Sequence, residues 1–216
     1  MKRDLLIFTS PASAGKDYIL NKCVEEFGWH KAVSHTTRPP RIGEVDGKDY
    51  FFINPMEFNE NLANNEFLET TKYQTTSGTW YYGFHKDSVS GDGIKCMILN
   101  PDGIDQMIAN GYAERMMIVY VLCDIETRIK RYYNRLGDNP TEHQLAEGYL
   151  RLLRDINDFD EFKKEFRYTD EFHCSQIDDY KYKSVPLIGV FNIEDDDVED
   201  ALVSIKDFTE VLNDEV

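Results

Sequence analysis

Residues 5–27 read LLIFTSPASAGKDYILNKCVEEF, and the pattern changes twice along this stretch. The apolar run Leu5–Thr9 is typical of a buried β-strand. Small residues then predict a tight turn, and a helical pattern follows that we expect to end at Gly28. A strand, a tight turn and a helix in direct succession are typical of α/β proteins with a parallel sheet.

The rest of the chain continues this alternation. Strands are expected around residues 31–34, 95–99, 116–122 and 187–191, and helices between 99 and 116, over 124–168 and over 198–212. Residues 50–83 read as a mixture of strands with a helix over 55–64, and a further helix is expected to start near Lys86. The alternation predicts an α/β fold with helices on both faces of a parallel sheet.

Composition limits the class of protein. The 216 residues suffice for one α/β domain with inserted subdomains, and the longest apolar run, about residues 116–122, is far too short to cross a membrane. A net charge of -16 disfavours binding to a nucleic acid polymer, which requires Lys and Arg to neutralise phosphates. None of the four cysteines forms a CxxC pair, so we expect no zinc site or disulfide framework. These features favour a cytoplasmic protein that binds neither nucleic acid nor membrane.

A candidate phosphate-binding loop follows the first strand and comprises Ser10, Pro11, Ala12, Ser13, Ala14, Gly15, Lys16 and Asp17. Of the pattern G-x-x-x-x-G-K-[ST], Gly15 and Lys16 match, whereas Ser10 replaces the first glycine and Asp17 replaces the Mg²⁺-binding hydroxyl. Backbone N–H groups at the start of the helix would bind phosphate oxygens. Asp17 could ligate Mg²⁺ or only complement the helix dipole, and the segment could also be a plain turn with a surface lysine.

The segment at residues 34–50 reads SHTTRPPRIGEVDGKDY. Arg38 and Arg41 lie three residues apart around Pro39 and Pro40, and the prolines stiffen the chain and disfavour a helix. Both guanidinium groups are therefore presented from an extended segment. Because a guanidinium donates parallel hydrogen bonds, this arrangement suits a phosphate dianion. Taken singly, either arginine could instead form a surface salt bridge.

This segment resembles the GMP-binding signature of guanylate kinases, SxTTRxPRxGExxGxDYxF. The matching residues are Ser34, Thr37, Arg38, Arg41, Gly43, Glu44, Gly47, Asp49, Tyr50 and Phe52. The resemblance implies that Glu69 reads the guanine edge, with help from Ser34, because a carboxylate accepts two hydrogen bonds that adenine cannot offer. The residues implied to grip the GMP phosphate are Arg38, Arg41, Tyr50 and Tyr82, and the whole implied GMP-binding set is Ser34, Arg38, Arg41, Glu44, Tyr50, Glu69, Tyr82 and Asp102.

Two positions beside this set depart from the family pattern. Phe84 stands where the family has a second base-reading hydroxyl. Asn100 replaces the first aspartate of the family's LDxD segment, whereas Asp102 matches the second. These departures point to a modified acceptor pocket or to a binding role without catalysis.

Residues 126–135 read ETRIKRYYNR and place Arg128, Arg131 and Arg135 on one face of a helix. The segment is similar to the family's KRLxxRG, whose arginines close over ATP. Arg131 and Arg135 match that segment, Leu136 replaces its glycine, and Arg128 has no counterpart. On spacing alone, the three arginines would be a solvated helix face.

The resemblance implies two further nucleotide-binding residues. A later arginine of the family that reaches the phosphates is best matched by Arg151, with Arg154 as the alternative. Asn192, in VFNIEDD, resembles a residue that lies near the nucleotide in the family.

The resemblance also implies the fold and organisation. The fold would be a P-loop three-layer αβα core with a parallel sheet, an inserted mixed α/β subdomain that binds the nucleoside monophosphate, and a helical lid. Residues 1–216 would form a single guanylate-kinase-like domain. Residues 1–34, 91–125 and 161–216 would be the core, 35–90 the acceptor-binding subdomain and 126–160 the lid.

The implied function is phosphoryl transfer from ATP to GMP or dGMP with Mg²⁺. The implied catalytic residues are Lys16, Arg38, Arg131, Arg135 and Arg151, the ATP-binding residues are Ser10–Asp17 and Asn192, and the candidate metal ligand is Asp17. The alternatives are a kinase for a different or modified nucleoside monophosphate and a non-catalytic binding module. Retention of Lys16 and the lid arginines argues against the module, and Asp17 argues for it. The expected partners are small-molecule nucleotides, with the chain a monomer or homodimer.

Overall fold

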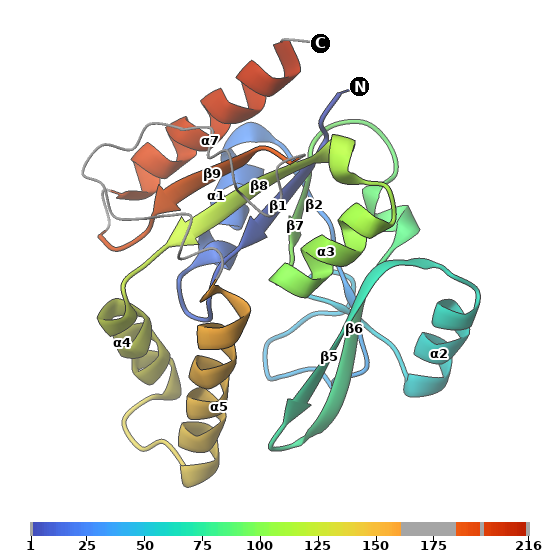
Figure 1. The fold of residues 1–216 in the computed structure, drawn as a ribbon. Coiled ribbons are helices and arrows are strands. Elements are labelled where there is room, and N and C mark those ends of the chain that lie inside the picture. Colours follow the sequence, from blue (N-terminus) through green and yellow to red (C-terminus); the bar gives the residue numbers. More distant parts are fainter. Residues whose placement is uncertain (1, 161–184, 195–196, 215–216) are drawn as a thin grey trace.

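The computed structural model describes residues 2–160, 185–194 and 197–214, and its centre is a five-stranded parallel sheet in the order β2-β7-β1-β8-β9 (Figure 1). The strands are β1 (Leu5–Thr9), β2 (His30–Lys31), β7 (Lys95–Ile98), β8 (Met116–Leu122) and β9 (Leu187–Phe191). All of their pairings are parallel. β1 pairs with β7 on one side and β8 on the other, so the loop after β1 lies where the chain order reverses. In open α/β sheets, ligands bind outside the carboxyl ends of the strands at such a point.

Two layers of helices cover this sheet because alternate side chains of a strand point to opposite faces. Leu6 and Phe8 of β1 pack with apolar residues of α1 (Lys16–Phe27) and α7 (Asp197–Asp214). Leu5 and Ile7 pack on the other side with α3 (Pro101–Ala109). The helices therefore form the outer layers of a three-layer core.

A second sheet carries the acceptor segment, in the order β4-β3-β6-β5. Its elements are β3 (His35–Thr36), β4 (Phe51–Phe52), β5 (Phe67–Thr75) and β6 (Gly78–His85), with α2 (Pro55–Ala63) between β4 and β5. Gln106 of α3 attaches this sheet to the core, because its amide donates to the carbonyl of Thr70 at 2.9 Å and accepts from the N–H of Thr70 at 3.0 Å.

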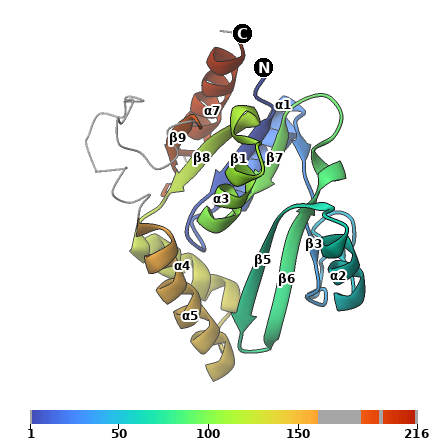
Figure 2. The ribbon, with the colours of Figure 1, turned by 45° about the vertical axis from the view of Figure 1, so that its right-hand side comes forward.

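Two further helices, α4 (Ile125–Leu136) and α5 (Glu142–Asp158), lie side by side and project away from the parallel sheet (Figures 1 and 2). Asp124 caps α4 by accepting from the N–H of Thr127. Thr141 and Gln144 form a capping box at the start of α5. These caps satisfy N–H groups that would otherwise lack partners in the first turn of each helix.

The α/β fold class, the parallel sheet and most of the expected elements are confirmed. The strand expected at residues 31–34 is largely wrong: only Lys31 lies in a strand, β2 of the core sheet, and residues 32–34 connect it to β3 of the acceptor sheet. The helix expected to start at Lys86 is wrong: Lys86–Val89 is a single 3₁₀ turn, η1, and Gly91 and Gly93 then adopt positive φ. Residues 161–168 of the long expected helical region lie outside the described residues.

The described helices include none that is both long and apolar enough to cross a bilayer. A second 3₁₀ turn, η2 (Ala113–Arg115), joins the core just before β8.

Candidate functional site

The candidate phosphate loop runs from the end of β1 to the start of α1. Ser13 and Gly15 adopt left-handed φ values of 64° and 94°. The side-chain amide of Asn192 donates to the carbonyl of Ala14 at 2.8 Å. A Cβ on Gly15 would lie 2.0 Å from that same amide nitrogen, so the close approach requires glycine. Because glycine has no side chain to cap α1, the first N–H groups of the helix are suited to an anion.

The acceptor segment and β6 form a cradle of Arg38, Glu44, Tyr50 and Tyr82. Arg38 is only 7% exposed. Its guanidinium donates to the Tyr82 hydroxyl at 3.2 Å and to Glu44 Oε1 at 2.8 Å. It also lies over the Tyr50 ring, 5.3 Å from the centroid. The rings of Tyr50 and Tyr82 contact edge to face. The structure thus brings these predicted phosphate ligands together.

Glu44 joins the two arginines of the cradle. Its Oε2 accepts from the backbone N–H of Arg41 at 2.7 Å, in addition to the bond from Arg38. Burial disfavours the Glu44 carboxylate, but the hydrogen bonds from Arg38 and Arg41 outweigh this and hold its pKa below the usual range. The Arg41 side chain itself is 61% exposed and can reach a ligand. Glu44 therefore positions arginines in this arrangement.

Charges of the phosphate loop, the cradle and the helical pair act on one another. Burial raises the pKa of Tyr50 to about 12, and the negative charge of Asp17 is one of the further causes. Burial lowers the pKa of Arg135, and the positive charges of Arg151 and Arg41 lower it further. Residues of the loop, the cradle and the helical pair therefore lie within electrostatic reach of one another.

The predicted base reader, Glu69, is 5% exposed. Its Oε1 accepts from the backbone N–H of Phe84 and its Oε2 from the Thr71 hydroxyl, both at 3.2 Å. Burial raises the pKa of Glu69 to about 7. Thr71 was not among the residues expected from the sequence. Phe84 is cross-strand from Glu69 and is buried in the core, so this position contributes its backbone N–H to Glu69 and no side-chain hydroxyl.

The remaining acceptor-side residues lie around the start of α3 and β3. Asn100 caps α3, because its Oδ1 accepts from the N–H of Gly103 at 2.8 Å. Asp102 accepts from Gln106 at 2.9 Å, and its charge contributes to the raised pKa of Glu69. Ser34 is half-buried just before β3. The amide of Asn100 thus performs the capping role that an aspartate could also perform.

Both arginines of α4 that the family resemblance singled out contact the phosphate loop. Arg131 donates to the carbonyl of Ala14 at 3.3 Å and to that of Asn192 at 2.8 Å. Arg135 donates to the Ser13 hydroxyl at 3.0 Å. Their predicted proximity to the loop is therefore present in the fold.

The two candidates on α5 point to different partners. Arg151 donates to Glu147 at 3.1 Å, and its charge acts on Arg135. Arg154 instead lies 4.9 Å from the ring centroid of Tyr73 in β5. Of the two, Arg151 is the one whose charge acts on Arg135, and its place near the phosphates stays a prediction.

Two further residues contact the loop: Arg128, which the sequence places on the face of the lid arginines without a role, and Asp155, which it does not mark. Arg128 donates to the carbonyl of Ala12 at 2.9 Å, and Asp155 accepts from the N–H of Ala12 at the same distance. The shared face of Arg128 and Arg131 could have indicated the first. No local pattern marks Asp155, whose partners are distant in the chain.

The donor set beside the loop fits Mg²⁺ held mainly by nucleotide phosphates and water. Asp17 is the carboxylate at the start of α1; its side chain is 67% exposed and lies 3.5 Å from Lys16 Nζ. Magnesium commonly takes one or two carboxylates together with substrate phosphates. Within the described ranges, no three His, Cys, Asp or Glu residues gather into a protein-only metal site.

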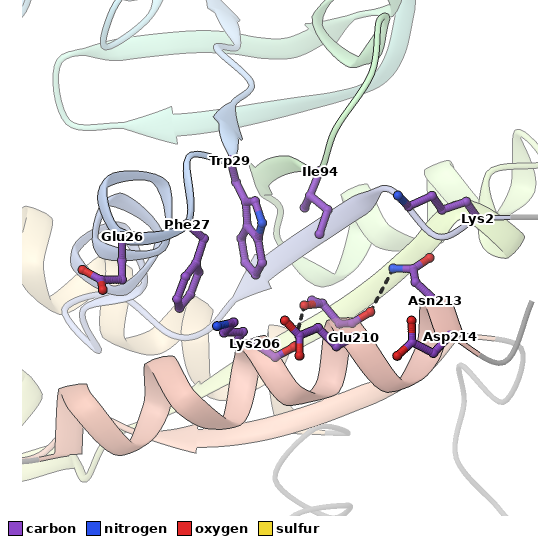
Figure 3. A pocket seen from close by; sticks show the side chains of 10 residues that line it. Lys2, Glu26, Phe27, Trp29, Ile94, Lys206, Glu210, Asn213 and Asp214 are labelled. Carbon is purple, nitrogen blue, oxygen red and sulfur yellow. Dashed lines mark hydrogen bonds between the residues drawn. The ribbon is translucent and has the colours of Figure 1, made fainter.

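A hollow of about 450 Å³ lies at the opposite edge of the parallel sheet, between α1 and α7. Figure 3 shows the rings of Phe27 and Trp29 pointing toward α7. The charged residues that line the hollow are Lys2, Lys206, Glu26, Glu210 and Asp214. Because carboxylates outnumber ammonium groups there, this hollow does not suit a phosphate.

Four features define the class of protein as a P-loop α/β protein that binds phosphates. They are the parallel-sheet fold, the loop after β1, the cradle and the arginines that contact the loop. A family model described as guanylate kinase matches residues 2–166. A guanylate kinase of Bacteroides fragilis is 32% identical over 155 residues, which cover 68% of this chain and 74% of that protein. The chain belongs to the guanylate kinase family.

Other relatives match more locally or in fold alone. A guanylate kinase of Protochlamydia amoebophila is 44% identical over 89 residues, 41% of this chain and 43% of that protein, so the match spans less than half of either chain. The crystal structure of guanylate kinase from Anaplasma phagocytophilum has a TM-score of 0.58 at 17% identity and covers 97% of this chain and 86% of that chain. This last likeness concerns the fold.

Proposed function

We propose that the chain transfers a phosphoryl group from ATP to GMP or dGMP. The observation that supports the proposal is the Arg38–Tyr82–Glu44 cradle, together with a candidate phosphate loop that Arg131 and Arg135 contact. Membership of the guanylate kinase family supports the same reaction. The proposed site has two phosphate-binding places, the loop and the cradle, and arginines of α4 contact the loop.

In the proposed reaction, an oxygen of the GMP phosphate attacks the γ-phosphorus of ATP in line, and the bond to the β–γ bridging oxygen breaks to release ADP. The acceptor oxygen is already anionic, so no general base is needed. Arg38 and Arg41 hold the acceptor phosphate, and Lys16 neutralises the β and γ phosphates. Asp17 would help to hold Mg²⁺ at those phosphates, and the ion would supply further positive charge there.

The helical pair completes the site. Arg131, Arg135 and Arg151 stabilise charge on the transferring group. We assign residues 126–160 as a lid, 35–90 as the acceptor subdomain and the remainder as the core. Closure of the lid excludes water, which suppresses ATP hydrolysis. Glu69 selects guanine, because its carboxylate accepts from N1–H and the 2-amino group.

Phe84 and Asn100 favour a second candidate, a kinase for a different or modified nucleoside monophosphate. Phe84 offers no side-chain hydroxyl at the position beside Glu69, so a base that lacks the matching polar group would be accommodated there. A non-catalytic binding module is the third candidate, and Asp17 in the place of a metal-binding hydroxyl is what favours it.

A steady-state assay with ATP, Mg²⁺ and a panel of nucleoside monophosphates distinguishes these candidates. We expect turnover on GMP and dGMP, and a loss of about 100-fold or more in kcat/KM for GMP in Glu69→Gln. Glu25→Gln, on the outer surface of α1, is the matched control and should retain full activity. Turnover only on another acceptor would select the second candidate. GMP binding without turnover on any acceptor would select the binding module.

A further inference from the structure

The buried ion pair between Arg128 and Asp155 is the feature of this region that the proposed reaction does not use. Arg128 Nη2 and Asp155 Oδ2 are 2.6 Å apart, and the side chains are 7% and 12% exposed. A buried ion pair of this kind seldom stabilises a protein more than apolar residues of similar volume would. Its presence therefore calls for a reason other than stability.

Both members of the pair hold the phosphate loop at one residue, Ala12. Arg128 Nε donates to the Ala12 carbonyl, and Asp155 Oδ2 accepts from the Ala12 N–H, each at 2.9 Å. The two backbone groups of Ala12 are thus engaged from the lid side. Ser13, the next residue, and Gly15, three residues after Ala12, adopt left-handed backbone conformations. Fixing Ala12 therefore restricts the orientation of the peptide groups that would meet the phosphates.

The pair also joins the two helices of the lid at their ends nearest the core. Arg128 lies in the first turn of α4, and Asp155 lies in the last turn of α5. Arg131 and Arg135 lie three and seven residues further along α4, on the same face as Arg128. Holding Arg128 against the loop consequently sets the rotation of α4, and with it the direction of the other two arginines.

We propose that Arg128 and Asp155 are positioning residues that fix the phosphate loop to the base of the lid and thereby aim Arg131 and Arg135 at the donor phosphates. The inference rests on the proposed function, because it assigns the loop to ATP. The pair acts through Ala12 and α4 and does not touch the reacting atoms.

The test is the double variant Arg128→Met with Asp155→Leu, which replaces the pair by apolar side chains. Such replacements of buried ion pairs are often neutral or stabilising, so the variant should retain its unfolding midpoint. We expect its Kd for ATP with Mg²⁺, measured by calorimetry without acceptor, to rise about tenfold or more, because the Ala12 groups lose both partners. The Kd for GMP should change less than about twofold, because the cradle is intact.

A second Arg–Asp pair offers a matched control. Arg115 Nη2 lies 2.7 Å from Asp4 Oδ2, just before the amino-terminal ends of β8 and β1. The phosphate loop follows the other end of β1. Arg115→Met with Asp4→Leu should alter the unfolding midpoint but leave the Kd for ATP unchanged. Equal weakening of ATP binding in the control would show a general effect of pair removal and would overturn the proposal.

Arg128→Lys keeps the inference testable should the double variant fail to fold. Lysine retains the charge near Asp155 but lacks the planar fork that also reaches Ala12, so the Kd for ATP should rise about fivefold. In either folded variant, Arg131→Ala should reduce kcat by a smaller factor than it does in the natural chain, because Arg131 is then already misdirected. A folded variant with a Kd for ATP within twofold of the natural chain would refute the proposal.

ATP binding separates this inference from the proposed function. A natural chain that binds ATP but turns over no acceptor would contradict the proposed function, and the positioning role would still be decided by the Kd comparison. A natural chain that does not bind ATP would contradict both.

Discussion

Glu69, the proposed guanine reader, is a buried carboxyl whose ionisation would affect ligand binding. Burial raises its pKa to about 7, so the free protein holds a proton there at mildly acidic pH. A protonated carboxyl has lost one of its acceptor sites for guanine. Guanine recognition and proton release at Glu69 are therefore linked.

We predict that GMP affinity increases as the pH rises through about 7 and becomes constant above it. Because GMP selects the ionised carboxylate, the Kd should fall by up to about tenfold per pH unit between pH 5.5 and 7. Calorimetry in buffers of different ionisation enthalpy measures both the Kd and the proton released. An affinity that is independent of pH over this range, after allowance for the GMP phosphate, would contradict the role of Glu69.

The same raised pKa predicts how the stability of the unliganded chain depends on pH. The pKa of Glu69 in the folded state lies above its ordinary value of 4.5. Its contribution to the free energy of unfolding is therefore fully present below pH 4.5 and is lost as the pH rises through about 7. The shift corresponds to roughly 3 kcal/mol, taken as an order of magnitude. Urea unfolding at pH 5 and pH 8 should show this difference, and Glu69→Gln should reduce it.

At the scale of elements, the turn from β1 to α1 depends on one glycine. Gly15 has a positive φ, and a Cβ there would collide with the Asn192 amide. Gly28, at the other end of α1, also has a positive φ but nothing lies within 4 Å of its absent Cβ. A side chain at Gly28 would therefore cause backbone strain alone, whereas one at Gly15 would cause both backbone strain and a steric clash.

We predict that Gly15→Ala abolishes measurable ATP binding, since the Asn192 contact must break and the loop must move. Gly28→Ala should lower the free energy of unfolding by only about 1–2 kcal/mol, from the left-handed backbone alone, and should bind ATP normally. Chemical denaturation and ATP titration of both variants provide the comparison. Normal ATP affinity in Gly15→Ala would show that the loop geometry is unimportant.

At the scale of the whole molecule, the lid already contacts the acceptor sheet. Arg154 of α5 lies over the Tyr73 ring and donates to the carbonyl of Gln74 at 3.4 Å. Glu147 accepts from the N–H and hydroxyl of Thr76 at 3.3 and 3.2 Å. The β5–β6 hairpin therefore meets α5 (Figure 2).

We predict that Arg154→Met weakens closure, so that water reaches ATP more often. The ratio of ADP to GDP produced should rise several-fold, because lid closure excludes water from the site. Parallel quantification of both products measures this ratio. Lys130→Met makes the same charge change on an exposed position of α4 and should leave the ratio at its natural value. An identical ratio in all three proteins would refute the closing role of Arg154.

The sequence by itself determined the order of the elements, the fold class and the family. Those conclusions depended on contiguous patterns: the apolar strands, the loop before α1 and the segment at residues 34–52. Such patterns are readable because the residues that cooperate are neighbours in the chain. The lid arginines on α4 were readable for the same reason, as three positions on one helical face.

Only the tertiary structure decided which distant residues meet. The partners of Ala12 lie 116 and 143 residues away, so no local periodicity could connect them. The burial of Phe84 beside Glu69 and the different partners of Arg151 and Arg154 also depend on how helices pack against sheets. A side chain's partner is set by packing of elements far apart in sequence, whereas a motif is set by chain geometry over a few residues.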